Sequence, residues 1–190
     1  MSYPTQSPPR RTVEPACEPI TLDEAKLQCR VYHDDEDTWF NSAITTARMW
    51  VEGEINRTLI TTTWETVLDW FPCDEIKLRK PPLLTISSIV YVDANGDSRT
   101  LSASSYLVET KGIVGRVTPA YGYFWPDTRG QIGAVTVTYT AGYGASPASV
   151  PQSIRTAIAL RVEQQYRRDE KYAVAAIDSL LAEFRIVEYG

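Results

Sequence analysis

The residues that could carry out acid–base or nucleophilic chemistry are few in this sequence. His33 is the only histidine, so a serine- or cysteine-based catalytic triad would have to be built around it. It directly precedes an acidic helix start, where an exposed turn explains a histidine better than catalysis does. There is also no Gly-x-Ser-x-Gly motif to present a nucleophilic serine. The sequence therefore predicts no catalytic residue and no cofactor.

Metal binding is equally poorly supported. The three cysteines are widely spaced and never form a Cys-x-x-Cys pair, so with one histidine they supply no zinc ligand set. These free thiols are Cys17, Cys29 and Cys73. An acidic run at 34–37 lacks the alternating ligands and the central glycine of a calcium loop. We interpret it as a helix start, because acidic side chains favour the positive end of the helix dipole.

Two patterns suggest phosphate binding only superficially. The segment 142–144 (Gly-Tyr-Gly) follows an expected strand and precedes an expected helix, but Pro147 replaces the third glycine of a dinucleotide fingerprint. Basic residues near the end of the same helix alternate with acidic ones, which is typical of a solvated or intersubunit salt-bridged face. The basic residues are Arg161, Arg167, Arg168 and Lys171. The net charge of −5 also disfavours contact with a phosphate backbone.

One aromatic segment is unusual for a loop. Four aromatic side chains follow one another within six residues and are interrupted by a glycine and a proline. They are Tyr121, Tyr123, Phe124 and Trp125. Such residues either cap a sheet or anchor a protein–protein interface. Both interpretations stay open from the sequence, and we keep the four as candidates for an interface.

The elements that position these residues begin after a proline-rich segment. Residues 1–19 contain five prolines and almost no large apolar side chains, so we expect a flexible, extended arm. Thr21 and Glu24 form a capping box, which predicts a short helix. Apolar residues spaced three and four apart then predict a second helix over about 35–56. These apolar residues are Phe40, Ile44, Ala47, Val51 and Ile55.

The apolar period changes to two after this helix. Alternation and turn residues predict strands at 61–71, 76–78, 86–92, 113–118 and 134–140. Asn95-Gly96 predicts a two-residue hairpin turn in which both residues adopt positive φ. Helical spacing returns within 151–184. The order predicts an α+β fold, with helices from both ends of the chain packed as a helical core and a β-rich hairpin region inserted at about 61–140.

The bulk properties agree with one soluble domain over 20–190. The chain has 190 residues, of which 43% are hydrophobic and 23% charged, as in ordinary globular proteins. This composition excludes collagen-like, coiled-coil and wholly disordered chains. No stretch of 18 or more uncharged apolar residues is present, so we expect no membrane span and no signal core.

Several segments, in their order and spacing, resemble the head-tail connector (adaptor, or head-completion) proteins of long-tailed bacteriophages and prophages. The segments are EPITLDEAK at 18–26, Trp64, WFP at 70–72, LRKPPL at 78–83, IVYVD at 89–93, VTVTYTAGYG at 135–144 and IDSLLAEFR at 177–185. The resemblance covers nearly all of 18–185. It implies a non-enzymatic virion protein that is assembled in the bacterial cytoplasm and forms a dodecameric ring below the portal. The ring would extend the DNA channel and provide the docking surface for neck or tail proteins.

The same resemblance assigns partners to the candidate residues. The partners are the portal protein, neighbouring copies of the chain, a stopper or tail-completion protein, and packaged DNA that passes through the lumen without sequence-specific binding. Apolar residues at the C-terminus are candidates for the portal interface: Phe184, Ile186, Val187 and Tyr189. The aromatic residues at 121–125 would contact neck or tail proteins or the next subunit. An acidic set would face the lumen and repel DNA: Asp34, Asp35, Glu36 and Asp37.

Two other functions remain open from the sequence. The first is a tail-terminator or stopper-type neck protein, because such proteins also form rings. The second is a small hydrolase that uses the loop at 121–125 as a substrate clamp. The hydrolase would need a general base, for which Asp127 and Glu109 are the nearest candidates.

Overall fold

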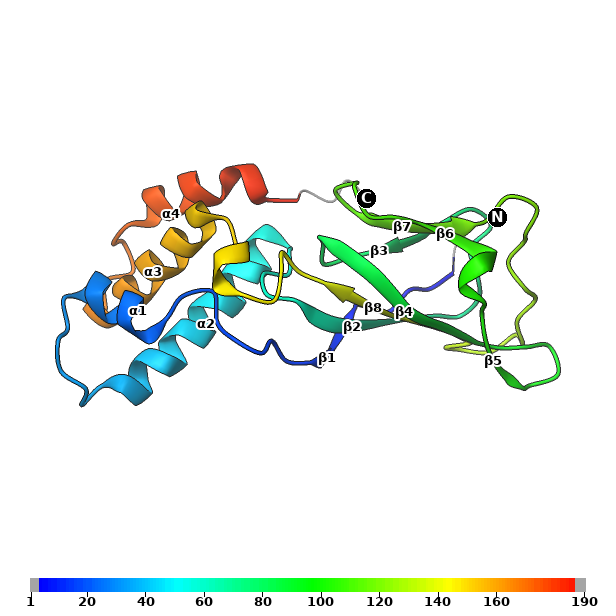
Figure 1. Ribbon diagram of the computed structural model, residues 1–190, viewed down its shortest axis with the longest axis horizontal. Coiled ribbons are helices and arrows are strands. Elements are labelled where there is room, and N and C mark those ends of the chain that lie inside the picture. The colour runs from blue at the N-terminus through cyan, green and yellow to red at the C-terminus, as the bar shows by residue number, and fades with distance from the viewer. Residues whose placement is uncertain (1–3, 187–190) are drawn as a thin grey trace. The chain divides into compact units, whose positions relative to one another are not determined.

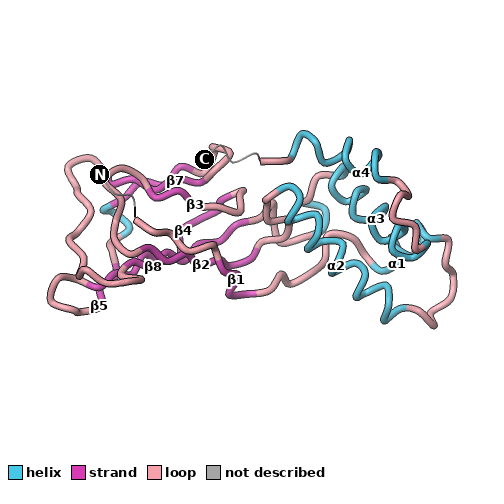
Figure 2. The backbone as a smooth tube through the Cα atoms, turned by 180° about the vertical axis from the view of Figure 1, so that it is seen from behind, coloured by secondary structure: helices cyan, strands magenta, loops and turns pink. Residues whose placement is uncertain are grey.

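A computed structural model describes residues 4–186, which form two compact units (Figure 1). The first, called the β unit here, comprises residues 1–14 and 62–142, and the second, the helical unit, comprises 15–61 and 143–190. The sequence predicted one domain over 20–190, and the structure groups the chain into these two compact units. The predicted α+β class is confirmed, since the α-helices lie in the helical unit and the strands in the β unit, which also holds a short 3-10 helix at Ala103–Ser105 (Figure 2).

The helical unit contains four α-helices. They are α1 (Leu22–Cys29), α2 (Asp37–Ile55), α3 (Gln152–Arg167) and α4 (Val174–Leu181). Short 3-10 helices at Pro147–Ser149 and Ala182–Phe184 precede α3 and follow α4. The predicted capping box is confirmed, because the Glu24 amide donates to Thr21 Oγ1 at 3.1 Å and the Thr21 amide donates to Glu24 Oε2 at 2.8 Å.

The apolar stripe predicted for α2 forms the centre of the helical core. All five of its members are buried, and they pack with α3 residues such as Ile154, Ile158 and Val162. α4 adds Ile177 and Leu181 to the same cluster. The helices from the two ends of the chain therefore share one core, as the sequence predicted.

The β unit contains two antiparallel sheets. A five-stranded sheet has the order β1-β2-β8-β4-β5, and a three-stranded sheet has the order β3-β7-β6. The strands are β1 (Arg10–Val13), β2 (Thr62–Leu68), β3 (Ile76–Leu78), β4 (Leu83–Val92), β5 (Ser98–Thr100), β6 (Tyr106–Glu109), β7 (Gly115–Pro119) and β8 (Val135–Ala141). β2 and β8 alternate between buried and partly exposed residues along their whole length. This alternation is the period of two that the sequence showed.

The N-terminal segment differs from its prediction. Instead of a flexible arm, residues 10–13 form β1, which pairs with β2 at the edge of the larger sheet. The Ser7 amide also donates to the Val67 carbonyl at 2.8 Å. Backbone hydrogen bonds hold this segment, and they require no apolar side chains, so composition alone could not reveal the strand.

The turn between β4 and β5 also differs from its prediction. The Asp93 amide donates to the Asp97 carbonyl at 2.9 Å, which leaves a three-residue loop instead of a two-residue one. Gly96 has a φ of 95°, whereas Asn95 is not in the left-handed region. Asp93 Oδ1 accepts hydrogen bonds from the Asn95 and Asp97 amides at 2.9 and 3.0 Å. This carboxylate stabilises the longer turn.

Over the described part of the chain, none of the helices combines the length and the apolar character that crossing a membrane requires.

Candidate functional site

The aromatic loop of the β unit divides into one inward and three outward side chains. Trp125 stacks on Phe71 with ring centroids 4.9 Å apart and an interplanar angle of 5°. By contrast, Tyr121 and Phe124 are 102% and 89% exposed, and Tyr123 is 51% exposed. Trp125 therefore packs against the core of the β unit, while the other three rings are exposed and stay candidates for an interface.

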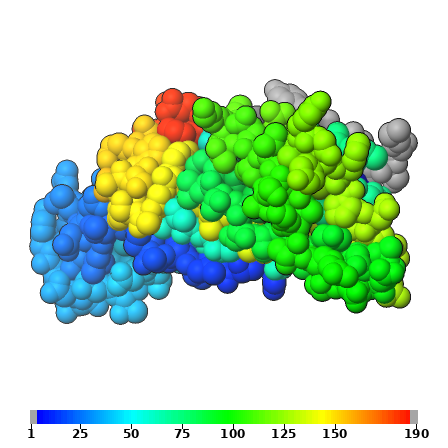
Figure 3. Space-filling model, turned by 45° about the vertical axis from the view of Figure 1, so that its right-hand side comes forward, coloured from blue at the N-terminus to red at the C-terminus, as the bar shows by residue number. Residues whose placement is uncertain are grey.

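Two further large apolar side chains of the β unit are exposed, and together with the three rings they are called the apolar surface here. Ile132 is 92% exposed and Leu107, in the edge strand β6, is 60% exposed. Figure 3 shows the segment around 120–132 in yellow-green at the surface of the molecule. Where such side chains form one contiguous patch, the patch is typical of a protein interaction site.

The acidic run at 34–37 lies in the connection between α1 and α2. Lys26 Nζ is 2.6 Å from Asp34 Oδ1 and 2.8 Å from Asp37 Oδ1. The hydrogen bond from Lys26 lowers the pKa of Asp34. Glu36 accepts a hydrogen bond from the Tyr166 hydroxyl at 3.0 Å and makes no side-chain cap to α2. The run therefore leads into α2, which begins at Asp37 as the interpretation of a helix start predicted, and its side chains contact α1 and α3 instead of capping the helix.

The four carboxylates of this run differ in their access to solvent. The side chains of Asp34 and Asp35 are 90% and 93% exposed, whereas those of Glu36 and Asp37 are 41% and 35% exposed. His33, predicted as an exposed turn residue, is exposed and lies 3.5 Å from Asp35. Two of the four candidates for the lumen thus have exposed side chains, although the carboxylate of Asp34 is paired with Lys26.

The acidic excess of the chain is confined to the helical unit. The β unit holds nine basic and nine acidic residues, and the helical unit holds ten basic and fifteen acidic residues. The whole net charge of −5 therefore comes from the helical unit, and the β unit is neutral.

The C-terminal candidates follow α4 and pack back on the helical unit. Arg57 Nε donates to the Phe184 carbonyl at 2.7 Å, and the Ile186 amide donates to the Ile55 carbonyl at 3.3 Å. Phe184 is half-buried against the helical core. Val187 and Tyr189, the other two predicted contacts, lie outside the described residues.

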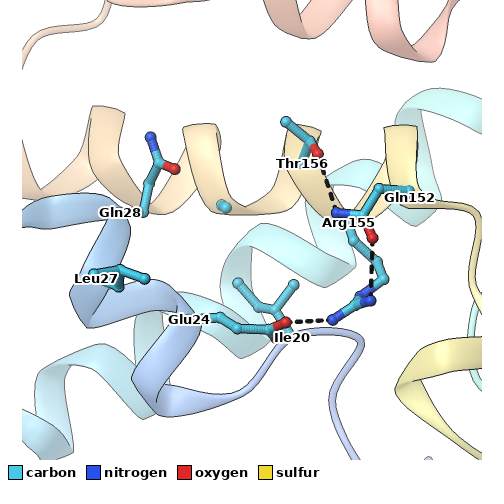
Figure 4. Close-up of a pocket in the computed structure, with 8 residues that line it drawn as sticks. Ile20, Glu24, Leu27, Gln28, Gln152, Arg155 and Thr156 are labelled. Carbon is cyan, nitrogen blue, oxygen red and sulfur yellow. Dashed lines mark hydrogen bonds and ion pairs between the residues drawn. The ribbon is translucent and has the colours of Figure 1, made fainter.

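A polar cavity of about 280 Å³ lies between α1 and α3 (Figure 4). Arg155 crosses it and donates to Glu24, to Gln152 Oε1 at 3.2 Å and to the Pro19 carbonyl at 3.0 Å. The Thr21 backbone hydrogen bond, followed by the contacts with Arg155, lowers the pKa of Glu24. These groups satisfy one another and hold α1 on α3, so the cavity offers no base with a substrate-facing partner.

Nothing in the described part of the chain supports the hydrolase or a metal centre. Across residues 4–186, no group of three or more histidine, cysteine or acidic side chains is placed to hold a metal ion. Glu109, one candidate base, accepts a hydrogen bond from the Lys111 amide at 2.6 Å within its own turn. Asp127, the other, is an exposed loop residue.

Part of the chain matches a known protein family. Residues 19–82 match the model of the phage gp6-like head-tail connector proteins. The resemblance to head-tail connectors is thereby confirmed. The connector match indicates a structural protein and not an enzyme. It begins at the last residue of the proline-rich segment and ends in the β unit.

Three solved structures share the whole fold at 21% sequence identity. A chain in the neck of an empty gene transfer agent (GTA) particle, computed with C6 symmetry, has a TM-score of 0.83 and the alignment covers 97% of this chain and 98% of that one. A chain in the virion of the native GTA particle has a TM-score of 0.79, with 96% and 97% covered. A chain in the neck of the native particle, computed with C12 symmetry, has a TM-score of 0.73, with 94% and 97% covered. No curated protein matches the chain.

Proposed function

We propose that this chain is a connector subunit in the neck of a phage or phage-like particle, where twelve copies form a ring below the portal. The observation that carries the proposal is the fold shared over 97% of the chain with a protein of a particle neck. The connector match at 19–82 supports it independently. The symmetries of those necks, C6 and C12, are both compatible with twelve subunits around one axis.

In this proposal the apolar surface of the β unit docks the next protein of the neck or tail. Tyr121, Tyr123 and Phe124 are its anchors, because a few large side chains, often aromatic, supply most of the binding energy in protein interfaces. Trp125 holds the loop in place through Phe71. Alternatively, these rings contact the neighbouring subunit of the ring.

The helical unit lines the DNA channel in this proposal. Its acidic excess would repel the phosphate backbone, so that DNA slides without sequence-specific binding. Asp34 and Asp35, the most exposed carboxylates of the run, are the foremost candidates for the lumen. The segment beyond α4, with Phe184 and Ile186, docks into the portal, and the particle assembles in the host cytoplasm.

Electron microscopy of the purified chain mixed with the portal of the same particle tests the function. We expect a ring of twelve subunits on the portal. Deletion of 185–190 should abolish portal binding while the circular dichroism of the helices is unchanged. A chain that binds tail components and not the portal would instead be a stopper or tail terminator, and the proposed place below the portal would be wrong.

A further inference from the structure

Within the helical unit, α3 lies between α2 and α4. It packs against each of them, and α2 and α4 flank it on opposite sides (Figure 1). Each flanking helix buries one face in the shared core. Each therefore also has an outer face that, among residues 4–186, meets no other helix of this unit.

The outer face of α2 carries no charged side chain from Thr38 to Gly53. The two charged residues in that span, Arg48 and Glu52, are only 2% and 7% exposed and point into the unit. Exposed positions at helical spacing make up the outer face: Thr38, Ser42, Thr46, Met49 and Gly53. Met49 is 60% exposed and Trp39, beside this face, is 39% exposed. A face without charges loses little hydration energy when another protein covers it.

Gly53 gives a separate indication that a second backbone approaches this face. Its φ is not in the left-handed region, so the helix does not require glycine there. A Cβ atom built on it would meet nothing within 4 Å. Glycine inside a helix costs about 0.5–1 kcal/mol relative to alanine. No contact within the described chain explains that cost, whereas close packing by another chain would.

The outer face of α4 carries mostly small side chains. Opposite the buried Ile177 and Leu181, Ala175 and Ser179 are exposed. Charges lie only beside it: Asp178 is 51% exposed and pairs with Arg185, and Glu183 is exposed in the 3-10 helix that follows. Val174, at the start of the helix, is 44% exposed. Small residues let a second helix approach closely. By contrast, the exposed end of α3 is strongly charged.

We propose that the outer face of α2 in one subunit packs on the outer face of α4 in the next copy of this chain. A ring needs two different surfaces on opposite sides of each subunit, so that the contact repeats head to tail until it closes. These two faces have that placement in the helical unit. This inference rests on the ring of the proposed function and names the surface that closes it.

Charged substitutions on the two faces test the contact in the full-length chain. We expect Met49→Glu and Ala175→Glu each to reduce the number of rings on the portal at least tenfold in negative-stain images. Both positions are exposed, so circular dichroism and melting temperature should stay near those of the wild type. Leu27→Glu is the matched control, because Leu27 is 66% exposed on α1, and it should form rings normally.

The double variant Met49→Glu/Ala175→Lys makes the test specific for pairing. In a head-to-tail ring every interface would then contain one glutamate and one lysine, and ring formation should return to at least half of the wild-type level. Normal rings from either single variant, or a double variant no better than the singles, would overturn the inference. If only Met49→Glu were defective, α2 would meet something other than α4 and the inference would be wrong. Failure of the wild-type chain to form any ring on the portal would instead refute the proposed function.

Discussion

Arg48 Nε donates to Glu18 Oε2 at 2.7 Å and thereby joins the segment before α1 to the middle of α2. Arg48 is 2% exposed. Its Nη1 also donates to Glu52 at 3.1 Å, and Glu52 Oε1 accepts from the Leu59 amide at 3.0 Å. Burial acts against the charge of Arg48, but the two carboxylates outweigh it and raise its pKa. One buried cation thus connects the middle of α2 to the segment before α1 and, through Glu52, to the segment after α2.

Removal of this cation should strongly destabilise the helical unit. Arg48→Met removes the cation that pairs with the carboxylate of Glu52, which is itself 7% exposed. Breaking a buried ion pair from one side costs about 3–5 kcal/mol. Urea unfolding followed by circular dichroism measures the loss. The matched control is Arg185→Met, whose pairs with Asp178 and Glu54 are partly exposed; we expect it to cost less than about 1 kcal/mol. Equal losses in the two variants would contradict the assigned role of Arg48.

Acid should weaken the helical unit through Glu163. Burial acts to raise the pKa of Glu163, but hydrogen bonds from Gln28 and Arg167 outweigh it and lower the pKa below the usual 4.5. Because the pKa of Glu163 is lower in the folded chain, the unfolded chain binds more protons at acidic pH. Ionised Glu163 therefore stabilises the folded state above about pH 4.5, and this stabilisation is lost as the pH falls through the folded-state pKa. Urea midpoints measured from pH 6 to pH 3 should fall less steeply for Glu163→Gln. Identical slopes would show that Glu163 does not contribute.

Two substitutions in the aromatic loop should have different effects, one on the stability of the β unit and the other on partner binding. Trp125→Ala removes the stacked contact with Phe71 and should lower the stability of the β unit by about 3 kcal/mol, the lower end for loss of a packed aromatic side chain. Phe124→Ala, which changes a ring 89% exposed, should leave thermal unfolding unchanged and weaken capture of the neck or tail partner in a pull-down. A Phe124→Ala chain that captures the partner as the wild type does would remove this ring from the interface.

Local patterns were predicted well from the sequence, and contacts between distant segments were not. The capping box at Thr21 and the stripe of α2 depend on neighbours within a few residues, so both were predicted correctly. The inward position of Trp125 depends on Phe71, which is far away in the chain. Because four similar rings occur in one short segment, composition could not show which of them packs on the sheet.

The burial of Arg48 could have been noticed from its place in the helix. Arg48 lies between Ala47 and Val51 of the apolar stripe, on the buried side of α2. Its spacing of four from Glu52, however, is also that of an ordinary surface pair. The deciding partner, Glu18, lies 30 positions earlier, in the proline-rich segment. Helical spacing alone contains no information about that segment, and this is why the sequence did not reveal the network.

The three thiols should differ sharply in reactivity. Burial, followed by the charge of Glu163, raises the pKa of Cys29 to about 11, so almost none of it is thiolate at pH 8. Cys73 is exposed. A disulfide-exchange reagent at pH 8 should therefore modify Cys73 first and Cys29 only after unfolding in urea. Cys73→Ser should remove the fast phase; a fast phase that persists in this variant would show that Cys17 or Cys29 is accessible.

Two glycines should respond to alanine in opposite directions. At Gly115 a Cβ atom would lie 2.4 Å from Leu83 Cδ2 and 2.8 Å from Leu83 Cβ, so Gly115→Ala overpacks the core of the β unit and should cost about 1–3 kcal/mol. At Gly53 the added methyl group meets open space, and Gly53→Ala should stabilise the isolated chain by up to about 1 kcal/mol through its higher helix propensity. Thermal unfolding of the two variants gives the signs directly.

The same Gly53→Ala variant should change both the stability of the isolated chain and its ability to form rings. If the close approach at α2 is the reason for glycine, alanine should raise the melting temperature of the isolated chain and at the same time reduce ring formation on the portal, because the methyl group occupies space that the next subunit needs. A stability gain without any change in assembly would show that the outer face of α2 accommodates a side chain at this position. A stability loss would instead mean that the helix itself requires glycine at residue 53.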